Sequence, residues 1–337
     1  MTLHINLAEN SYDITVARGA ISRAAALFSL DRRVLVLTDS GVPSAYAKCV
    51  ADACREATIL TVPEGEGSKS LETLALVLSK MTETGLTRTD ALVAVGGGVV
   101  GDLGGFAAAA YMRGIDFYNV PTTLLSQVDS SIGGKTAVNH AGVKNIVGAF
   151  HQPRGVLIDP DLLATLPARQ MASGMAEIIK MAATSGAALF NELEKAADPY
   201  TALEEIIPKA LAIKAAVVEA DPKENGLRRI LNFGHTVGHG IEAAADGTLF
   251  HGECVALGML PMCSTAVRAR LTTLFEKVGL PTSTALDVDT VLSTLSHDKK
   301  CKGGEIHYIY VPEIGSFSIE RAALPTYLAQ VKEALTK

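Results

Sequence analysis

The amino-acid sequence predicts an α/β domain with a mostly parallel sheet, followed by a mainly α-helical domain. Three observations predict this organisation. Apolar runs bounded by turn-forming residues alternate with helical periodicity in the first half. Long segments rich in Ala, Leu, Glu and Lys fill the second half from about residue 160. The 337 residues, 48% of them hydrophobic, suffice for two cores. We therefore expect domains at 1–160 and 161–337.

The strands of the first half are short apolar runs between turn formers. Because helical segments separate these runs, they predict a mostly parallel sheet. One intervening helix, residues 70–85, has Ser70 as a candidate N-cap and Gly85 as a candidate C-terminal stop. The four expected strands are residues 32–39, 57–66, 91–98 and 117–125.

The second half has helical periodicity over most of its length. Residues 159–197 and 201–221 are expected to form consecutive helices. Residues 305–320 are the exception, because apolar and polar residues alternate there around a Pro/Gly turn, which predicts a hairpin.

Composition excludes some classes of function. The net charge of −6, the 5% aromatic content and the absence of Trp argue against a nucleic-acid-binding protein. An anionic small molecule remains compatible, because a local basic pocket can form in an acidic protein. The five cysteines form no C-x-x-C pair, and the N-terminus has no signal peptide, so we expect reduced thiols and a cytoplasmic location.

The segment GGGVVGDLGGF (96–106) contains a G-x-G-x-x-G pattern. It follows an expected strand and should open a helix, whose N-terminal N–H groups and dipole favour a phosphate. A tight strand–helix turn would also explain the glycines, but the context and glycine density favour phosphate binding. The loop follows the third expected strand, whereas the standard dinucleotide fold carries it after the first. Polar residues near the ends of the earlier strands are Asp39, Glu66 and Lys69.

Residues 122–153 are unusually polar for so long a segment. The alternatives are a surface loop and a loop that binds substrate or cofactor, and we favour the second because long structureless stretches in compact domains tend to be functional. Lysines among glycines also suit phosphate binding. The polar residues concerned are Asp129, Lys135, Asn139, Lys144 and Asn145.

Two histidines four residues apart, His235 and His239, share one face if their segment is helical. The spacing alone leaves open whether they bind a metal ion, a substrate or nothing. Arg228, Asn232 and His239 would fall near one helical stripe. Glu177, one of these histidines and His251 could form a two-His, one-carboxylate set that suits Zn²⁺. A surface ion pair is the alternative for Glu177 with Lys180, three residues on.

Several segments together resemble the 3-dehydroquinate synthase family, a branch of the sugar-phosphate cyclases. The resemblance runs from about residue 10 to 320 and implies an N-terminal NAD-binding domain and a C-terminal helical domain that holds the metal ion. It depends on GGGVVGDLGGFAAAAYMRG, VPTTLLSQVDSSIGGKTAVNH, GMAEIIK, LNFGHTVGHGIE, HGECVALGM and DKK, in this order.

The resemblance also implies which residues form the site. Zn²⁺, or Co²⁺ in its place, would be held by Glu177, His235 and His251, while His239 would face the substrate. The NAD positions are Asp39, Glu66, Lys69, Gly97, Gly98, Val99, Asp102, Thr122, Thr123, Lys144, Thr165 and Leu166. The substrate positions are Asp129, Lys135, Asn145, Lys180, Lys214, Arg228, Asn232, His239 and Lys300, the last chosen over Lys299. Arg113 would reach the substrate phosphate in a neighbouring subunit, which implies a homodimer. Gly41 stands where the family usually has Asn.

The implied reaction converts 3-deoxy-D-arabino-heptulosonate 7-phosphate into 3-dehydroquinate and phosphate, a lyase step of the shikimate pathway. It combines transient oxidation at C5 by NAD, β-elimination of phosphate, reduction, ring opening and aldol closure. The alternatives are a cyclase acting on another sugar phosphate and a metal-dependent polyol dehydrogenase. A non-catalytic nucleotide-binding protein would be expected to have a disrupted metal set, and the trio here is intact.

Overall fold

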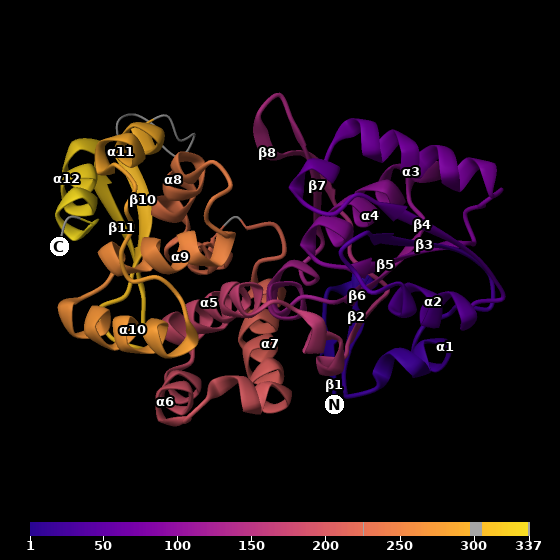
Figure 1. Ribbon diagram of the computed structural model, residues 1–337, viewed down its shortest axis with the longest axis horizontal. Coiled ribbons are helices and arrows are strands. Elements are labelled where there is room, and N and C mark those ends of the chain that lie inside the picture. The colour runs from indigo at the N-terminus through magenta and orange to yellow at the C-terminus, as the bar shows by residue number, and fades with distance from the viewer. Residues whose placement is uncertain (225, 297–304, 336–337) are drawn as a thin grey trace. The chain divides into compact units, whose positions relative to one another are not determined.

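The computed structural model describes residues 1–224, 226–296 and 305–335. The chain divides into two compact units, Met1–Leu166 and Pro167–Lys337. The first is an α/β unit and the second is mainly helical, as Figure 1 shows. This confirms the predicted fold class. Lys299 and Lys300 lie outside the described residues.

Seven strands of the described part of the first unit form one sheet, in the order β1-β2-β9-β6-β5-β3-β4. β1 pairs antiparallel with β2, and every other pair is parallel. The strands are β1 (Thr2–Ile5), β2 (Tyr12–Val16), β3 (Arg33–Asp39), β4 (Glu56–Val62), β5 (Ala91–Gly96), β6 (Asp116–Pro121) and β9 (Gly155–Ile158). The four predicted strands are therefore confirmed as β3 to β6.

Helices cover both faces of this sheet. Leu74, Val77 and Leu103 belong to the hydrophobic cluster on one face of the sheet, while Ala47 and Val50 belong to the cluster on the opposite face. Burying each Leu or Val side chain stabilises the folded state by roughly 1.5–3 kcal/mol. The helices of the first unit are α1 (Ala24–Leu27), α2 (Ser44–Asp52), α3 (Leu71–Glu83) and α4 (Gly98–Ala110), with short helices η1 (Ala8–Asn10), η2 (Ala20–Arg23), η3 (Glu66–Ser68), η4 (Tyr111–Arg113), η5 (Ser126–Ser130) and η6 (Pro160–Thr165).

The capping prediction for α3 is confirmed. The Ser70 side chain accepts a hydrogen bond from the Thr73 backbone N–H at 3.1 Å. Such a cap contributes about 1 kcal/mol. Gly85, just beyond the helix, has φ +67°, which glycine adopts without steric cost.

The prediction of a long loop over residues 122–153 is wrong. Strands β7 (Lys135–His140) and β8 (Val143–Phe150) form an antiparallel hairpin there, preceded by the π-helix η5. The connecting residues Ala141 and Gly142 have φ values of +50° and +77°, as a two-residue type I′ turn requires. The small residues around the turn obscured the alternation of two short strands.

The second unit consists of helices and one hairpin in its described part. Its hairpin, β10 (Glu305–Tyr310) with β11 (Ser318–Ala323), confirms the prediction for residues 305–320. The helices are α5 (Ala168–Ser185), α6 (Ala187–Lys195), α7 (Leu203–Ala220), α8 (His235–Ala245), α9 (His251–Met259), α10 (Thr265–Val278), α11 (Val288–Ser296) and α12 (Leu324–Leu335), with η7 (Pro199–Ala202), η8 (Leu227–Asn232) and η9 (Leu260–Met262). Among the described residues, no helix is long and apolar enough to cross a membrane.

The prediction that Arg228, Asn232 and His239 lie along one face of a single helix is wrong. Arg228 and Asn232 belong to the 3₁₀ helix η8, and α8 begins only at His235. Gly234 separates the two helices with φ +78°, a left-handed conformation that favours glycine. The break turns the start of α8, so His235 is its first residue.

Candidate active site

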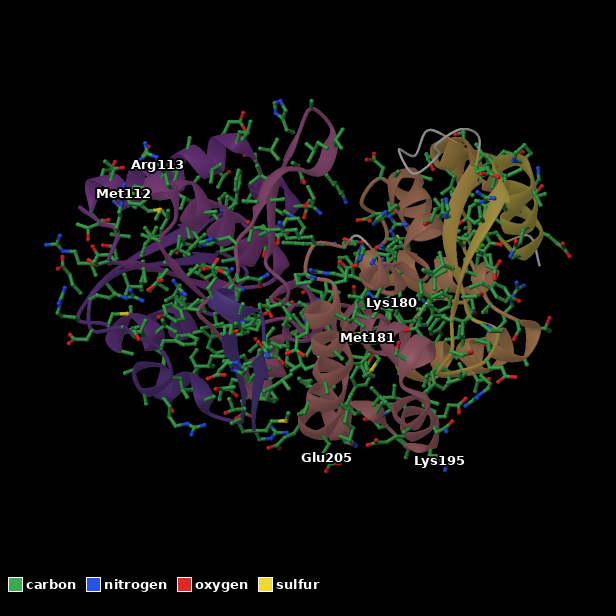
Figure 2. All side chains as sticks on the ribbon, turned by 180° about the vertical axis from the view of Figure 1, so that it is seen from behind. Met112, Arg113, Lys180, Met181, Lys195 and Glu205 are labelled. Atoms are coloured by element: carbon green, nitrogen blue, oxygen red, sulfur yellow. The ribbon has the colours of Figure 1, made fainter. Side chains whose placement is uncertain are left out.

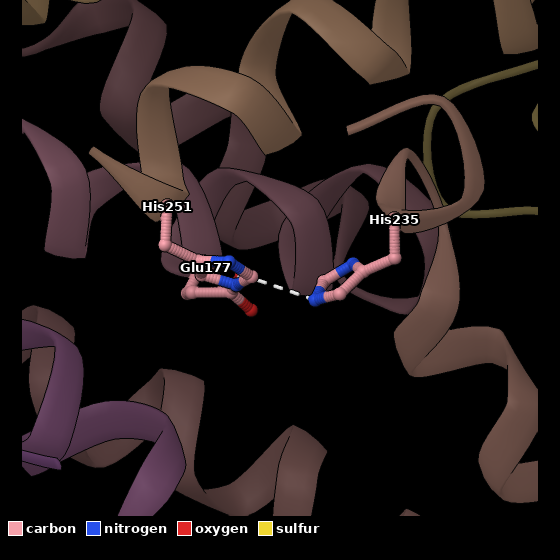
Figure 3. Close-up of side chains that lie close together, drawn as sticks. All are labelled: Glu177, His235 and His251. Atoms are coloured by element: carbon pink, nitrogen blue, oxygen red, sulfur yellow. Dashed lines mark ion pairs between the residues drawn. The ribbon is translucent and has the colours of Figure 1, made fainter. Parts of the chain in front are cut away.

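Three helices of the second unit bring Glu177, His235 and His251 together (Figure 3). Glu177 lies in the middle of α5, and the histidines are the first residues of α8 and α9. The Glu177 Oε1 atom lies 3.6 Å from His235 Nε2 and 3.7 Å from His251 Nε2. These separations are close to the roughly 3.3 Å between two ligands of one tetrahedral ion.

Glycines allow these helices to approach so closely. A Cβ added to Gly252, directly after His251, would lie 2.0 Å from the backbone oxygen of Ser173 on α5. A Cβ on Gly258 would lie 2.1 Å from the backbone oxygen of Gly234, just before α8. The convergence of the three candidate ligands therefore depends on small residues that a sequence pattern for metal ligands does not include.

The donor set fits a divalent transition-metal ion. Glu177 is fully buried. Its Oε2 atom pairs with the Lys180 ammonium, while its Oε1 atom accepts no hydrogen bond from the residues that the structure describes. A buried carboxylate oxygen without a hydrogen-bond partner is costly, and a second cation facing the two histidines would compensate Oε1. One carboxylate and two imidazoles are ligands that Zn²⁺ favours, and a three-ligand set leaves positions for water or substrate.

Lys180 lies one helical turn from Glu177 and forms an ion pair with its Oε2 atom. Its side chain is only 2% exposed, and the residue lies among the helices of the second unit (Figure 2). The alternative of a surface ion pair is therefore wrong, because both groups are buried. A buried ion pair is weak evidence for stability, so its position beside the metal-ligand candidates favours a chemical role.

His239 is the exposed member of the histidine group. Its ring lies 5.6 Å from that of His235 and 6.2 Å from that of His251, centroid to centroid. It belongs to a second group of possible ligands with Glu242 and His251, rather than to the group that contains Glu177. His235 and His239, the pair with i,i+4 spacing, therefore belong to two different groups of possible ligands.

Three further substrate candidates of the second unit are Lys214, Arg228 and Asn232, of which the two cations are buried. Lys214 of α7 and Arg228 are each 3% exposed. Arg228 Nη1 donates to the Pro222 backbone oxygen at 2.7 Å, and Asn232 Nδ2 donates to Glu224 Oε1 at 2.7 Å. Glu224 was not among the predicted residues, although its place four residues before Arg228 lies within the same polar segment.

In the first unit, the glycine loop starts α4 as predicted. Gly97 is the N-cap and Gly98 the first helical residue, followed by Val99. A Cβ on Gly97 would lie 3.1 Å from Thr123 Cγ2, and one on Gly98 would lie 3.0 Å from Ser130 Oγ. Thr122, whose backbone N–H donates to the Gly96 oxygen at 3.0 Å, is buried beside this turn. The first turn of α4 thus offers backbone N–H groups that have no intrahelical partner, and such groups can bind a phosphate.

Lys69 connects a predicted cofactor position, Asp102, to a predicted substrate position, Asn145, through hydrogen bonds. Its Nζ atom donates to Asp102 Oδ2 at 2.6 Å and to Asn145 Oδ1 at 2.5 Å. Burial raises the pKa of the Asp102 carboxyl, and the Lys69 ammonium opposes this shift. Glu66 accepts a hydrogen bond from Asn139 at 2.8 Å. Asn145 has φ +53°, so the hairpin presents it with a strained backbone.

Asp39 and Gly41 follow β3 directly. Burial raises the pKa of the Asp39 carboxyl, although the backbone N–H groups of Gly41 and Val42 lower it. A Cβ on Gly41 would lie 2.4 Å from Glu64 Oε2. The space that a larger residue at position 41 would use is therefore occupied by the Glu64 side chain, a residue that the sequence analysis did not include.

The remaining predicted residues lie on other elements of the first unit, and the charge of Asp129 adds to the rise that burial causes in the pKa of the Asp102 carboxyl. Arg113 is exposed on the turn after α4, where Met112, Arg113 and Gly114 all have positive φ (Figure 2). Asp129 lies in η5, Lys135 begins β7, and Lys144 lies in β8. Thr165 ends η6 and Leu166 follows it, so both belong to the first unit.

Comparisons with known proteins show the family to which the chain belongs. The family described as "3-dehydroquinate synthase N-terminal" matches residues 59–173, and that described as "3-dehydroquinate synthase C-terminal" matches residues 174–301. A 3-dehydroquinate synthase from Latilactobacillus sakei is 41% identical, over 98% of each chain.

Two solved structures are similar over nearly the whole chain. A 2-deoxy-scyllo-inosose synthase complexed with carbaglucose-6-phosphate, NAD⁺ and Co²⁺ superposes with a TM-score of 0.91 at 27% identity, covering 99% of this chain and 100% of that one. A 2-epi-5-epi-valiolone synthase from Streptomyces hygroscopicus, with NAD⁺ and Zn²⁺ bound, gives 0.85 at 29% identity, covering 97% and 98%. With full-length identity above 40% to the first relative, the chain belongs to the 3-dehydroquinate synthase family.

Proposed function

We propose that this chain converts 3-deoxy-D-arabino-heptulosonate 7-phosphate into 3-dehydroquinate and phosphate, and so acts in the shikimate pathway. The observation that carries the proposal is the buried Glu177 carboxylate, which faces His235, His251 and the Lys180 ammonium in a chain of this family. Because the reaction eliminates phosphate from carbon, we assign the chain to the carbon–oxygen lyases.

The cofactors that we propose are NAD⁺ and one Zn²⁺ or Co²⁺ ion. Two similar structures contain NAD⁺, one with Co²⁺ and the other with Zn²⁺. Glu177, His235 and His251 would hold the ion, and the start of α4 with Asp39, Lys69 and Asp102 would hold the dinucleotide. When bound, NAD⁺ supplies a hydride acceptor and the ion supplies a Lewis acid for substrate oxygens.

The chain's own side chains would bind the two anionic groups of the substrate. Lys214 and Arg228 are buried cations of the second unit, at positions where the family resemblance implies contact with the substrate. The Arg228 guanidinium suits a bidentate carboxylate. Asp129 and Lys180 would hold and move protons of the hydroxyl groups. The further members of the substrate set are Lys135, Asn145, Asn232 and Lys300.

We further propose that the enzyme is a homodimer in the cytoplasm. Arg113 would bind the substrate phosphate of the neighbouring subunit. Its exposure and its left-handed backbone, φ +69°, support this role because strain of this kind tends to be retained at functional positions. The four described cysteines form no disulfide bond, which is compatible with a reducing compartment.

Replacing His239 with Ala should leave one zinc ion bound per chain while turnover falls about 10²- to 10⁴-fold, the range for loss of a general acid or base. His239 is exposed and outside the group that contains Glu177, so the ion should not depend on it. Zinc content by mass spectrometry and phosphate release measure the two effects. His307→Ala is the control, since His307 is also exposed but lies on β10. Loss of zinc from the His239 variant would refute this assignment.

Phosphate release from three sugar phosphates tests the substrate. We expect turnover with 3-deoxy-D-arabino-heptulosonate 7-phosphate, and none with sedoheptulose 7-phosphate or glucose 6-phosphate. The 41% identity to a 3-dehydroquinate synthase, against 27–29% to the two other cyclases, favours this result. Turnover of one of the other sugars alone would assign the chain to another cyclase.

A further inference from the structure

The two imidazoles that face Glu177 are each in contact with a second acceptor. His235 Nδ1 lies 3.3 Å from the Phe233 backbone oxygen, and His251 Nδ1 lies 3.3 Å from Glu242 Oε2. The Nε2 atom of each ring faces Glu177. A neutral imidazole carries one N–H group, so a ring whose Nε2 offers its lone pair must carry the proton on Nδ1. Each ring has an acceptor for that proton.

Glu242 is placed for this contact by the packing of α8 against α9. It lies seven residues after His235, which is two helical turns and therefore the same face of α8. A Cβ on Gly238 would lie 3.0 Å from the Cys254 backbone oxygen, so glycine there keeps the two helices close. The Glu242 side chain is 18% exposed, which strengthens its contact relative to a surface pair.

We propose that Glu242 is a positioning residue for the metal ion. Its carboxylate accepts the Nδ1–H of His251, and so keeps the Nε2 lone pair of that ring directed at the ion beside Glu177. This inference rests on the metal site proposed above. Partners of this kind orient metal-binding histidines, and their removal weakens metal affinity about 10- to 100-fold. The equivalent partner of His235 is a backbone oxygen, so Glu242 is the partner that a substitution can remove.

The same carboxylate has one competing interpretation. Glu242, His239 and His251 form a second group whose possible ligand atoms lie within 4.8 Å of one another. Both groups contain His251, and an Nδ1 that donates its proton to Glu242 cannot bind an ion there. The positioning role is favoured because the first group includes the fully buried Glu177, whereas His239 is exposed.

Zinc affinity measured against a competing chelator tests this proposal in the full-length protein. We expect Glu242→Ala to weaken zinc binding about 10- to 100-fold. Glu242→Gln should lose several-fold less, because its amide oxygen can accept the same proton. The d–d spectrum of the Co²⁺-loaded protein should change in the Ala variant. Glu194→Ala is the matched control, since Glu194 is a partly buried carboxylate, 28% exposed, that pairs with Arg270 at 2.5 Å. It should lower stability and leave zinc affinity unchanged.

Three results would overturn the proposal while leaving the metal site intact. These are wild-type zinc affinity in Glu242→Ala, equal losses in the Ala and Gln variants, and two ions per wild-type chain falling to one in Glu242→Ala. The last would make Glu242 a ligand of a second ion. A wild-type chain that binds no zinc would instead refute the metal site of the proposed function, and this inference with it. Thermal unfolding of the metal-free variants separates lost affinity from lost folding.

Discussion

Replacing Glu177 with Gln should remove the bound metal ion and slow turnover by about 10³-fold or more, because a Lewis acid supplies several kcal/mol to the transition state. Glu177 is the only carboxylate of the group that it forms with His235 and His251, and its side chain is fully buried. The amide keeps the size of the side chain but loses the charge that a divalent ion needs. Zinc content after dialysis and phosphate release measure the two effects.

A second variant keeps this prediction testable if the first folds poorly. Glu177→Gln leaves the buried Lys180 ammonium without its ion-pair partner, and breaking a buried pair costs roughly 3–5 kcal/mol. His251→Ala keeps the buried Glu177–Lys180 ion pair and removes a side chain that is 32% exposed, and it should also lose zinc. Glu192→Ala, which breaks only a surface contact to Lys209 at 2.6 Å, is the control. Folded Glu177 and His251 variants with full zinc content would contradict the ligand assignment.

Replacing Gly252 with Ala should destabilise the second unit by at least about 3 kcal/mol, the upper part of the range for overpacking. The added Cβ would lie 2.0 Å from the Ser173 backbone oxygen and 2.6 Å from its carbonyl carbon. Backbone atoms cannot rotate away, so α9 must shift from α5. That shift separates His251 from Glu177, and zinc affinity should therefore fall with stability. Denaturant unfolding and chelator competition measure the two effects.

Gly67→Ala is the matched control for this substitution. Gly67 has no atom within 4 Å of an added Cβ, so its free energy of unfolding should change by less than about 0.5 kcal/mol. If Gly252→Ala were as stable as the wild type and bound zinc normally, the close approach of α5 and α9 would not set the ligand geometry.

Periodicity and turn chemistry predict much of the fold. β3 to β6 and α3 follow the expected ranges because each combines an apolar pattern with flanking turn or cap residues, such as Ser70. β1, β2 and β9 were not predicted. They are four to five residues long, and β1 has only one fully buried position, so their pairing depends on the rest of the sheet. The hairpin from Lys135 to Phe150 was missed for a similar reason, since its β8 strand is mostly exposed.

Part of the candidate site could likewise be predicted from the sequence, and part could not. Residue type and order indicated Glu177, the histidine pair and His251, but spacing alone could not choose between His235 and His239. That choice depends on Gly234, whose left-handed backbone makes His235 the first residue of α8. The burial of Lys180 could not be inferred from an i,i+3 spacing, which is equally typical of surface ion pairs. Glu242 could have been found, because it lies three residues after His239 on the same helical face.

Simultaneous measurement of phosphate release and NADH absorbance tests the central claim most directly. The purified chain, loaded with zinc and with catalytic amounts of NAD⁺, would receive 3-deoxy-D-arabino-heptulosonate 7-phosphate. We expect many equivalents of phosphate per NAD⁺ with no net NADH at steady state, because the proposed reaction restores its redox cofactor. Steady accumulation of NADH, or NADH without phosphate, would contradict the account and indicate a dehydrogenase.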